Sequence, residues 1–259
     1  MSRLHNLPYA LKQSFDNHSV LKVISGLNNF DKAVVTKVAR SASIGGADLL
    51  DIACDPELVR VVTEMSDVPV CVSSIEPKAF PDAVRAGATM IEIGNFDSFY
   101  PQGRFFNADE VMSLAIETRE LLPDVVLSVT VPHILPLDQQ SQLAVNLIDA
   151  GVDIIQTEGG TSSQPKQPGV LGLIEKSAPT IAAAYTISQT FLEVDCKAPI
   201  LCASGLSEVT VPMAIASGAF GVGIGSAIHR LSSEIEMIAM VKTMKAAVNS
   251  SKPKLLNTF

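Results

Sequence analysis

Polar side chains, which are charged, amide or hydroxyl groups, recur at alternate positions along short apolar runs of this sequence. The set comprises Lys22, Asp51, Glu92, Thr130, Gln156, Glu158 and Ser204. Side chains alternate across a strand, so these residues would share one face, which in a closed barrel is the interior. Charged residues are rarely buried without partners. A lysine facing two or three carboxylates therefore predicts either an active site at the barrel mouth or an ion network that fills the barrel centre.

Two kinds of chemistry suit Lys22. A lysine whose pKa is lowered by desolvation forms an imine with a carbonyl, while Asp51, Glu92 or Glu158 moves protons. A lysine that stays charged instead polarises a carbonyl or enolate oxygen without a covalent step. The sequence leaves both open, beside the alternative that Asp51 and Glu92 only neutralise Lys22.

One histidine joins these candidates. His133 follows the fifth apolar run directly after a proline, where a loop residue reaches the mouth of a barrel and titrates near neutral pH. A lone loop histidine is more often an incidental surface residue, but the position at a strand end gives the two interpretations of His133 equal weight. The candidate catalytic residues are Lys22, Asp51, Glu92, Glu158 and His133.

Glycines and serines follow the last two apolar runs in a pattern suited to an anion, at 204–207 and 223–226. Glycine lets the backbone approach an anion, and Ser226 can supply a hydroxyl and a helix N-cap. In eight-fold α/β barrels the loops after strands seven and eight commonly hold a phosphate. The predicted phosphate-binding residues are Ser204, Gly205, Gly223, Gly225 and Ser226. The alternative is that these glycines only make tight turns. His229 and Arg230 follow and could neutralise the anion.

The rest of the chain predicts the elements that position these residues. Eight short runs rich in Val, Ile and Leu are bounded by Gly or Pro, as in strands buried on both faces. They lie at 21–25, 49–53, 70–73, 90–93, 125–131, 154–157, 200–203 and 221–224. Amphipathic helical segments separate them, at 32–43, 109–122, 139–150, 208–217 and 234–248 among others. Alternating strands and helices predict a parallel sheet with right-handed crossovers.

The residues that directly precede these strands alternate between two types. A glycine and a small residue precede strands two, four, six and eight, and a proline precedes strands three, five and seven. Such a two-unit repeat, in 259 residues, predicts a single (β/α)8 TIM-barrel domain of the phosphate-binding type over residues 1–259, rather than an open doubly wound sheet. The strand positions between these polar residues are mostly apolar and should face outward to the helices. We assign to this outward face Leu21, Leu49, Ile91, Leu127 and Leu201 among others.

Composition narrows the partners. A net charge of −8 and a pI near 5.0 disfavour nucleic acid and anionic membranes, because phosphate groups require clustered Lys and Arg. The longest apolar stretches are strand-sized, and the first nine residues lack the character of a leader. The four cysteines form no CxxC pair and have no histidine at metal-ligand spacing, so we predict reduced cysteines and no metal. A phosphorylated small molecule is the expected partner.

Two long loops leave the same end of the predicted barrel. The first, 95–107, carries five aromatic residues, and the second, 159–169, is rich in Gly, Ser, Gln and Pro and should be mobile. Both could act as lids that exclude water. The aromatic loop could equally form a subunit interface, so a homo-oligomer is possible.

The stretches 21–27, 46–56, 157–161 and 202–206 resemble the family called hypothetical chloroplast open reading frame twenty-three, of algal plastids and cyanobacteria. The likeness runs over essentially the whole chain. It implies a TIM barrel and a setting in the cyanobacterial cytosol or the plastid stroma, and it supplies no catalytic residues. More distantly, the glycine-rich strand entries and 223–226 look like the phosphate-binding barrel superfamily, which includes thiazole synthase. The reactive lysine of that enzyme lies on a different strand from Lys22.

Three functions fit this sequence. The leading one is a lyase, synthase or isomerase that acts on a phosphorylated carbon compound. The second is a barrel that binds flavin mononucleotide (FMN), with the cofactor phosphate in the same loops. The third is a noncatalytic sensor or scaffold that keeps the phosphate pocket. Fold-level analogy does not choose among them.

Overall fold

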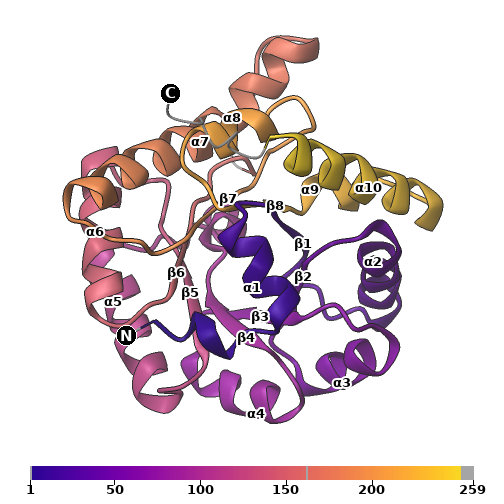
Figure 1. Cartoon of the computed structure of the whole chain (residues 1–259), viewed down its shortest axis with the longest axis horizontal. Helices are drawn as coiled ribbons and strands as arrows, with labels where there is room; N and C mark the ends of the chain where they lie inside the picture. The colour runs from indigo at the N-terminus through magenta and orange to yellow at the C-terminus, as the bar shows by residue number, and fades with distance from the viewer. Residues whose placement is uncertain (1, 162, 252–259) are drawn as a thin grey trace, which may run out of the picture.

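Eight parallel strands close into a barrel in sequence order (Figure 1). The structure is a computed structural model that describes residues 2–161 and 163–251. The strands are β1 (Val20–Gly26), β2 (Leu49–Ala53), β3 (Val70–Ser74), β4 (Met90–Ile93), β5 (Val126–Thr130), β6 (Ile154–Gln156), β7 (Ile200–Ala203) and β8 (Gly221–Ile224). Each pairs with the next, and β8 pairs with β1. The predicted (β/α)8 barrel is confirmed, and the open-sheet alternative is wrong.

Helices surround this barrel. The α-helices are α1 (Tyr9–Asp16), α2 (Lys32–Gly45), α3 (Pro56–Met65), α4 (Phe80–Arg85), α5 (Ala108–Leu121), α6 (Leu137–Asp149), α7 (Gly169–Glu193), α8 (Val211–Ala216), α9 (Ser226–His229) and α10 (Glu234–Ser250). Short 3₁₀ turns lie at η1 (Leu4–Asn6), η2 (Pro77–Ala79), η3 (Phe96–Ser98) and η4 (Tyr100–Gln102). The amino-terminal part of α7 projects from the ring of helices (Figure 1).

Local sequence explains where several helices begin and end. The Asp31 and Asp55 side chains accept backbone hydrogen bonds at the starts of α2 and α3, where free amides favour a carboxylate. Gly46 takes a left-handed conformation with φ of 83° after α2, which is favourable for glycine. The predicted helix 208–217 begins later, at Val211, because a hydrogen-bonded turn between Ser207 and Thr210 precedes it.

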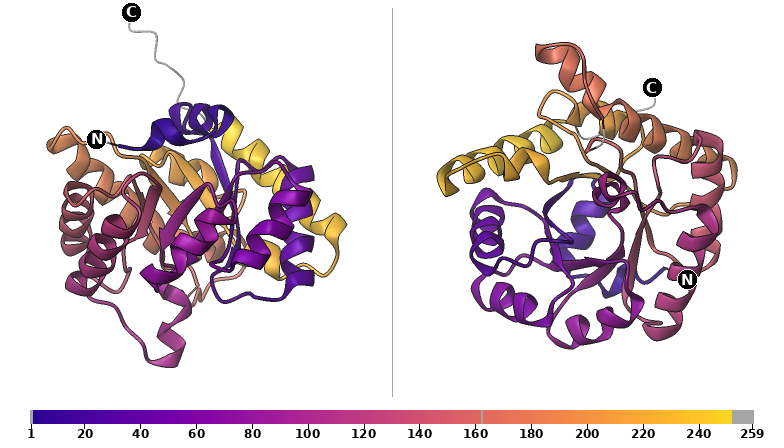
Figure 2. Two further views of the ribbon diagram at one scale, coloured as in Figure 1. Left: turned by 90° about the horizontal axis from the view of Figure 1, so that it is seen from below. Right: turned by 180° about the vertical axis from the view of Figure 1, so that it is seen from behind.

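The helix α1 closes the amino-terminal end of the barrel (Figure 2). Its residues Leu11 and Phe15 pack on an apolar layer that fills the barrel interior at this end. That layer comprises Val20, Leu49, Cys71, Met90, Val126, Ile154 and Leu201. The assignment of Leu49 and Leu201 to the outward face was therefore wrong. Leu49 is two residues from Asp51 and so shares its face, and Leu201 lies beside Gln156 in the strand register.

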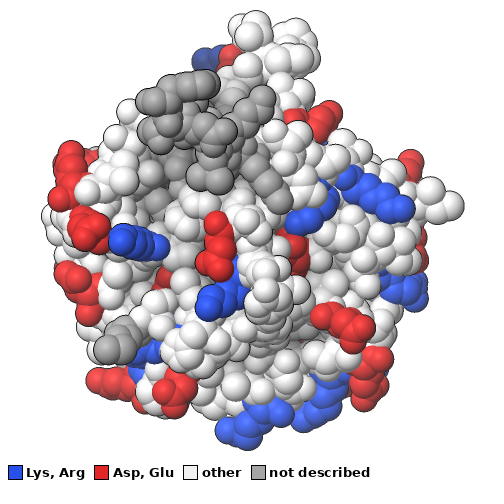
Figure 3. Space-filling model, viewed as in Figure 1, with Lys and Arg blue, Asp and Glu red and all other residues white. Residues whose placement is uncertain are grey.

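A second apolar core lies between the outward face of the strands and the helices. Leu21, Val23 and Ile91 belong to it, together with Val35 of α2 and Val241 of α10. On the face that carries α1, basic and acidic side chains are interspersed (Figure 3). Over the ranges that the structure describes, we find no helix with both the length and the apolar character needed to cross a membrane.

Candidate active site

Lys22 lies inside the barrel, beyond the apolar layer, and is completely buried. Its Nζ atom lies 2.7 Å from Glu92 Oε2, 3.0 Å from Gln156 Oε1 and 3.3 Å from Asp51 Oδ2. An ammonium has three N–H donors, so three acceptors are enough to engage all of them. The side chains come from β1, β2, β4 and β6, and all four are buried. The structure thus brings together four residues that parity placed on one face.

The two carboxylates beside Lys22 differ in how well their charges are balanced. Glu92 accepts hydrogen bonds from Lys22, from Ser128 Oγ at 2.8 Å and from the amide of the β6 glutamine at 2.6 Å. Asp51 accepts one close hydrogen bond, from Ser73 Oγ at 2.6 Å, beside its longer contact with Lys22. One ammonium cannot neutralise two carboxylates, and the weaker contacts assign the excess charge to Asp51.

The pKa values follow from this arrangement. Burial acts to lower the pKa of Lys22, but the charges of Asp51 and Glu92 raise that pKa above its ordinary value. Burial raises the pKa of Asp51 to about 6; the Glu92 charge adds to the rise, while Lys22 and Ser73 oppose it. Lys22 therefore stays charged near neutral pH, and Asp51 is able to exchange a proton there.

A cavity of about 350 Å³ opens at the carboxyl ends of the first strands. Asp51 and Ser73 line it from the barrel, and Asn95 and Ser98 line it from the loop after β4. His229 lines it from α9, and the His229 Nε2 atom lies 2.9 Å from a backbone oxygen of β1. Asp51 therefore connects the buried network with a space that a small molecule can occupy.

A second cluster of titratable side chains lies among the loops after β4, β5 and β6. Glu158 Oε1 accepts hydrogen bonds from Tyr100 Oη at 2.7 Å and from the His133 amide at 3.2 Å, and it lies 3.3 Å from His133 Nδ1. Glu158 Oε2 accepts a hydrogen bond from the Asp97 amide at 2.9 Å. Asp97 Oδ2 accepts one from the Thr161 amide at 2.9 Å. Glu158 and His133 thus form a cluster of their own, apart from Lys22.

The electrostatics of this second cluster favour a charged histidine. Burial acts to lower the pKa of His133, but the hydrogen bond and charge of Glu158, with the charge of Asp97, raise that pKa above its ordinary value. Burial and the Glu158 charge also raise the pKa of Tyr100. Tyr100 therefore keeps its proton and remains a hydrogen-bond donor to Glu158.

The aromatic loop after β4 is anchored by two buried rings, whereas its residues 101–105 are exposed. Phe96 and Phe106 are buried, with ring centroids 4.4 Å apart, and belong to the apolar core. Tyr100 contacts Glu158, and Phe105 is exposed. The expectation that all five aromatic residues lie on an exposed lid was therefore wrong for Phe96 and Phe106, because the core offers these rings apolar contacts. The subunit-interface alternative stays a prediction.

The loop 159–169 is partly tied down by hydrogen bonds. The Lys166 and Gln167 amides donate to Glu175 Oε2 at 2.6 and 3.1 Å, respectively. Gly160 lies against Gly205 so closely that a Cβ on Gly160 would be 2.4 Å from the Gly205 Cα atom. Position 162 of this loop lies outside the described residues. The mobility expected for the loop 159–169 stays a prediction.

The loops after β7 and β8 leave the barrel side by side, because Ala203 pairs with Gly223 in the strand register. Gly223 itself lies inside β8, and a Cβ on it would be 2.9 Å from the Ala203 Cβ atom, so close packing accounts for this glycine. In the described part of the chain, the amides of three loop residues and of the first residue of α9 donate no hydrogen bond. They are the amides of Gly205, Leu206, Gly225 and Ser226. Unpaired amides are the feature that an anion site requires.

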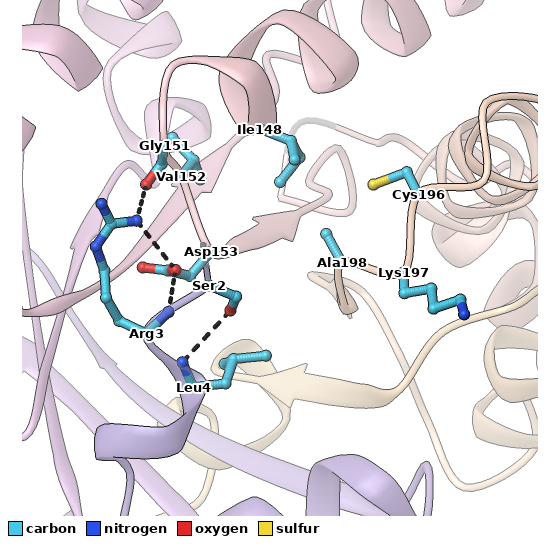
Figure 4. A pocket seen from close by; sticks show the side chains of 10 residues that line it. All are labelled: Ser2, Arg3, Leu4, Ile148, Gly151, Val152, Asp153, Cys196, Lys197 and Ala198. Atoms are coloured by element: carbon cyan, nitrogen blue, oxygen red, sulfur yellow. Dashed lines mark hydrogen bonds and ion pairs between the residues drawn. The ribbon is translucent and has the colours of Figure 1, made fainter.

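Another cavity, of about 330 Å³, lies at the opposite end of the barrel (Figure 4). The Arg3 amide donates to Asp153 Oδ1 at 2.7 Å, and Arg3 Nη1 donates to the Gly151 carbonyl at 2.9 Å. Asp153 Oδ2 also accepts from Arg119 Nη2 at 2.9 Å. These charges satisfy one another and hold the amino-terminal segment to the barrel. The carboxyl-end cavity is therefore the better candidate site.

Sequence reasoning missed several members of these clusters. Ser73 and Ser128 have the same strand parity as Asp51 and Glu92 and could have been found by extending the parity count to every strand. Asp97 and Tyr100 lie in a loop, where parity gives no signal. Over residues 2–161 and 163–251, no group of three or more His, Cys, Asp or Glu side chains has the arrangement of a metal site.

The fold and these clusters define a class: a (β/α)8 barrel with a buried lysine–carboxylate network beneath a cavity at its carboxyl end. The chain belongs to the family described as "protein of unknown function (DUF561)", whose model matches residues 4–254. It is 40% identical over 241 residues to "Uncharacterized protein ycf23" of Porphyra purpurea, covering 93% of this chain and 89% of that protein. It is 44% identical over 235 residues to the protein of the same name from Cyanophora paradoxa, covering 90% and 93%.

Solved structures with the same fold are distant in sequence. Thiamine phosphate pyrophosphorylase from Pyrococcus furiosus matches with a TM-score of 0.58 and 15% identity, over 91% of this chain and 98% of that one. A 3-hexulose-6-phosphate synthase matches with a TM-score of 0.61 and 14% identity, over 88% and 99%. At this identity the likeness establishes the fold alone.

Proposed function

We propose that this protein is an enzyme of the lyase, synthase or isomerase type that acts on a phosphorylated carbonyl compound at the carboxyl end of the barrel. Asp51 is the group that moves a proton, and Lys22 keeps Asp51 in place and supplies positive charge without forming a covalent bond. We expect the enzyme to work in the cyanobacterial cytosol or the plastid stroma.

The observation that carries this proposal is the contact of Asp51 with both the charged network and the mouth cavity. Asp51 lines the cavity, and its Oδ2 atom lies 3.3 Å from the Lys22 ammonium. A general acid or base works best with a pKa near the operating pH, and burial raises the pKa of Asp51 to about 6. A carboxylate so placed can take the proton next to a carbonyl group and return it to another atom.

The surroundings of Lys22 favour the noncovalent alternative over an imine. A nucleophilic amine must be neutral and must reach the carbonyl carbon. Lys22 is fully buried, donates hydrogen bonds to Glu92 and Gln156, forms an ion pair with Asp51 and has a pKa above its ordinary value. Because Asp51 separates Lys22 from the cavity, the lysine acts on the ligand through Asp51.

The loops after β7 and β8 supply the other half of the proposed site. Among the residues that the structure describes, the Gly205 and Gly225 amides have no acceptor, and His229 of α9 lines the same cavity as Asp51. A phosphate at these loops would orient its ester so that the carbonyl end reaches Asp51. The two similar structures are of a thiamine phosphate pyrophosphorylase and a 3-hexulose-6-phosphate synthase, and these names are compatible with a phosphorylated ligand here.

The test measures proton exchange next to a carbonyl group. The protein is incubated in D₂O with a panel of phosphorylated aldehydes and ketones, and ¹H NMR follows the loss of the proton next to the carbonyl. We expect exchange with at least one compound, and a rate about 100-fold or more lower for Asp51→Asn. Asp16→Asn at the amino-terminal end is the matched control. Absence of exchange across the panel would count against the proposal.

Two further measurements separate the alternatives. Borohydride reduction with a compound that undergoes exchange should leave the mass of the Lys22 peptide unchanged, and an added mass on Lys22 would establish the imine instead. Native mass spectrometry of freshly purified protein should show no flavin, and a retained phosphate ester would identify the ligand. A retained flavin with a yellow colour would favour the FMN barrel.

A further inference from the structure

The turn after β7 contains a serine in an unusual state. Ser204 has φ of 76°, in the left-handed region that non-glycine residues rarely adopt. Its Oγ atom is buried and has no hydrogen-bond partner among the described residues. A buried hydroxyl without a partner is unfavourable, and backbone strain of this kind concentrates at binding sites. The Gly205 and Leu206 amides that follow it also lack acceptors within the described ranges.

Helix α7 is held against this turn by a threonine. Thr180 Oγ1 donates a hydrogen bond to the Ala203 carbonyl at 2.5 Å and lies 2.6 Å from Thr157 Oγ1. Residues four apart lie on the same face of a helix, so Lys176 faces the same way one turn earlier. A Cβ built on Gly205 would lie 3.2 Å from Lys176 Cγ and 2.8 Å from the Lys176 carbonyl oxygen. The stem of Lys176 thus packs beside the turn that holds the unpaired groups.

Lys176 differs from the buried lysine of the barrel. Its side chain is partly buried, and across residues 2–161 and 163–251 its ammonium has no hydrogen bond or ion pair. The stem of a partly buried lysine packs against its neighbours while its ammonium stays accessible to a charged ligand. Here a cation, a hydroxyl and two amides without partners lie within one turn and its neighbouring helix, and all four are groups that bind an anion.

We propose that Lys176 is the cation of a subsite for the phosphate monoester end of the ligand, formed with the Ser204 hydroxyl and the Gly205 and Leu206 amides. This inference rests on the proposed function and names a residue outside the predicted set. The ammonium favours a dianion over a carboxylate or a neutral sugar, because its attraction grows with ligand charge. Lys176 then determines which ligands bind, while Asp51 remains responsible for the chemistry.

The contact between two glycines fixes the geometry of this turn. Gly160 of the loop after β6 lies against Gly205, and a Cβ on Gly160 would be 2.4 Å from the Gly205 Cα and N atoms. Only a residue without a side chain fits there, so the two loops hold each other. The amides of the turn are therefore held in place before a ligand arrives, which reduces the entropy lost on binding.

The test uses inorganic phosphate as the probe, by isothermal titration calorimetry of the full chain at about pH 8, where phosphate is mostly a dianion. We expect Lys176→Met to weaken phosphate binding at least tenfold, since a hydrogen bond to a charged group is lost. Lys12→Met, on the exposed face of α1, is the matched control and should bind as the wild type does. Acetate should bind neither protein measurably.

Two variants of Ser204 test the hydroxyl separately from the backbone. Ser204→Ala removes the hydroxyl and keeps the strain, whereas Ser204→Gly removes the hydroxyl and relieves the strain. Both should weaken phosphate binding severalfold, and Ser204→Gly should unfold at a higher temperature than Ser204→Ala. Circular dichroism of each variant confirms that it folds.

The outcomes are distinguishable. Phosphate binding to the wild type that Lys176→Met leaves unchanged would overturn the role of Lys176 and leave the proposed function standing. Equal binding by wild type and both Ser204 variants would remove the hydroxyl from the subsite. No phosphate binding by the wild type would count against both the subsite and the proposed phosphorylated ligand.

Discussion

Removing the ammonium of Lys22 should destabilise this barrel strongly. Lys22→Met keeps a side chain of similar length but leaves Asp51 and Glu92 buried without their cation. Breaking a buried ion pair by removing one partner costs about 3–5 kcal/mol. For a chain of this size, each kcal/mol lowers the melting temperature by about 2–4 °C. We therefore expect a decrease of roughly 6–20 °C at pH 7.

The assay is urea and thermal unfolding of the wild type and Lys22→Met, with Lys12→Met as an exposed control. The loss should shrink as the pH falls toward 4, because protonation then neutralises Asp51, whose pKa is raised to about 6. Adding Asp51→Asn and Glu92→Gln to Lys22→Met should recover part of the stability, since this network then contains no charged side chain. A decrease of less than about 1 kcal/mol, or one independent of pH, would refute the view that Lys22 is a charged and fully paired group.

Three other perturbations test separate parts of the structure. The pKa of the Asp51 carboxyl is raised to about 6 in the fold, so Asp51 stabilises the native state below its unfolded pKa, and this stability is lost as the pH rises toward 6. Asp51→Asn should remove this pH dependence of the unfolding free energy, which amounts to up to about 3 kcal/mol. Urea titrations at several pH values would show the change. The pKa of His133 should lie above its ordinary value by NMR titration and fall in Glu158→Gln, whereas an unchanged pKa would mean that Glu158 is not its charge partner. Gly160→Ala should cost about 1–3 kcal/mol and weaken phosphate binding, because the new Cβ overlaps Gly205; full stability with full binding would contradict the close contact.

The barrel was predictable from the sequence because strand length, apolar character and strand entry are local properties. The eight predicted runs overlap the eight observed strands, and β2, β4, β7 and β8 have the predicted bounds. The alternation of glycine and proline entries was informative because each residue type has a fixed backbone preference. Closure of the ring could be predicted from the repeat. The packing of α1 across the amino-terminal end of the barrel could not, because the sequence of a short amphipathic helix does not indicate where it docks.

The candidate site was predictable only in part. Parity correctly grouped Lys22 with Asp51, Glu92 and Gln156, because these residues lie within strands. It gave no information beyond the strand ends. Ser204 leaves the strand with a left-handed backbone. The partners of Glu158, the packing of Phe96 and the approach of Lys176 depend on how loops and helices pack in three dimensions, which no local pattern encodes.

The position of Lys22 has a consequence for how the chain folds. Its partners are 29, 70 and 134 residues away in the sequence, on the second, fourth and sixth strands. A fragment ending before Gln156 would lack one of the hydrogen-bond acceptors of Lys22. We therefore expect half of the ring to be less stable than the whole, because the contact of Lys22 with Gln156 requires β6. The surroundings of Asp51 and Lys22 are therefore complete only when β6 has joined the barrel.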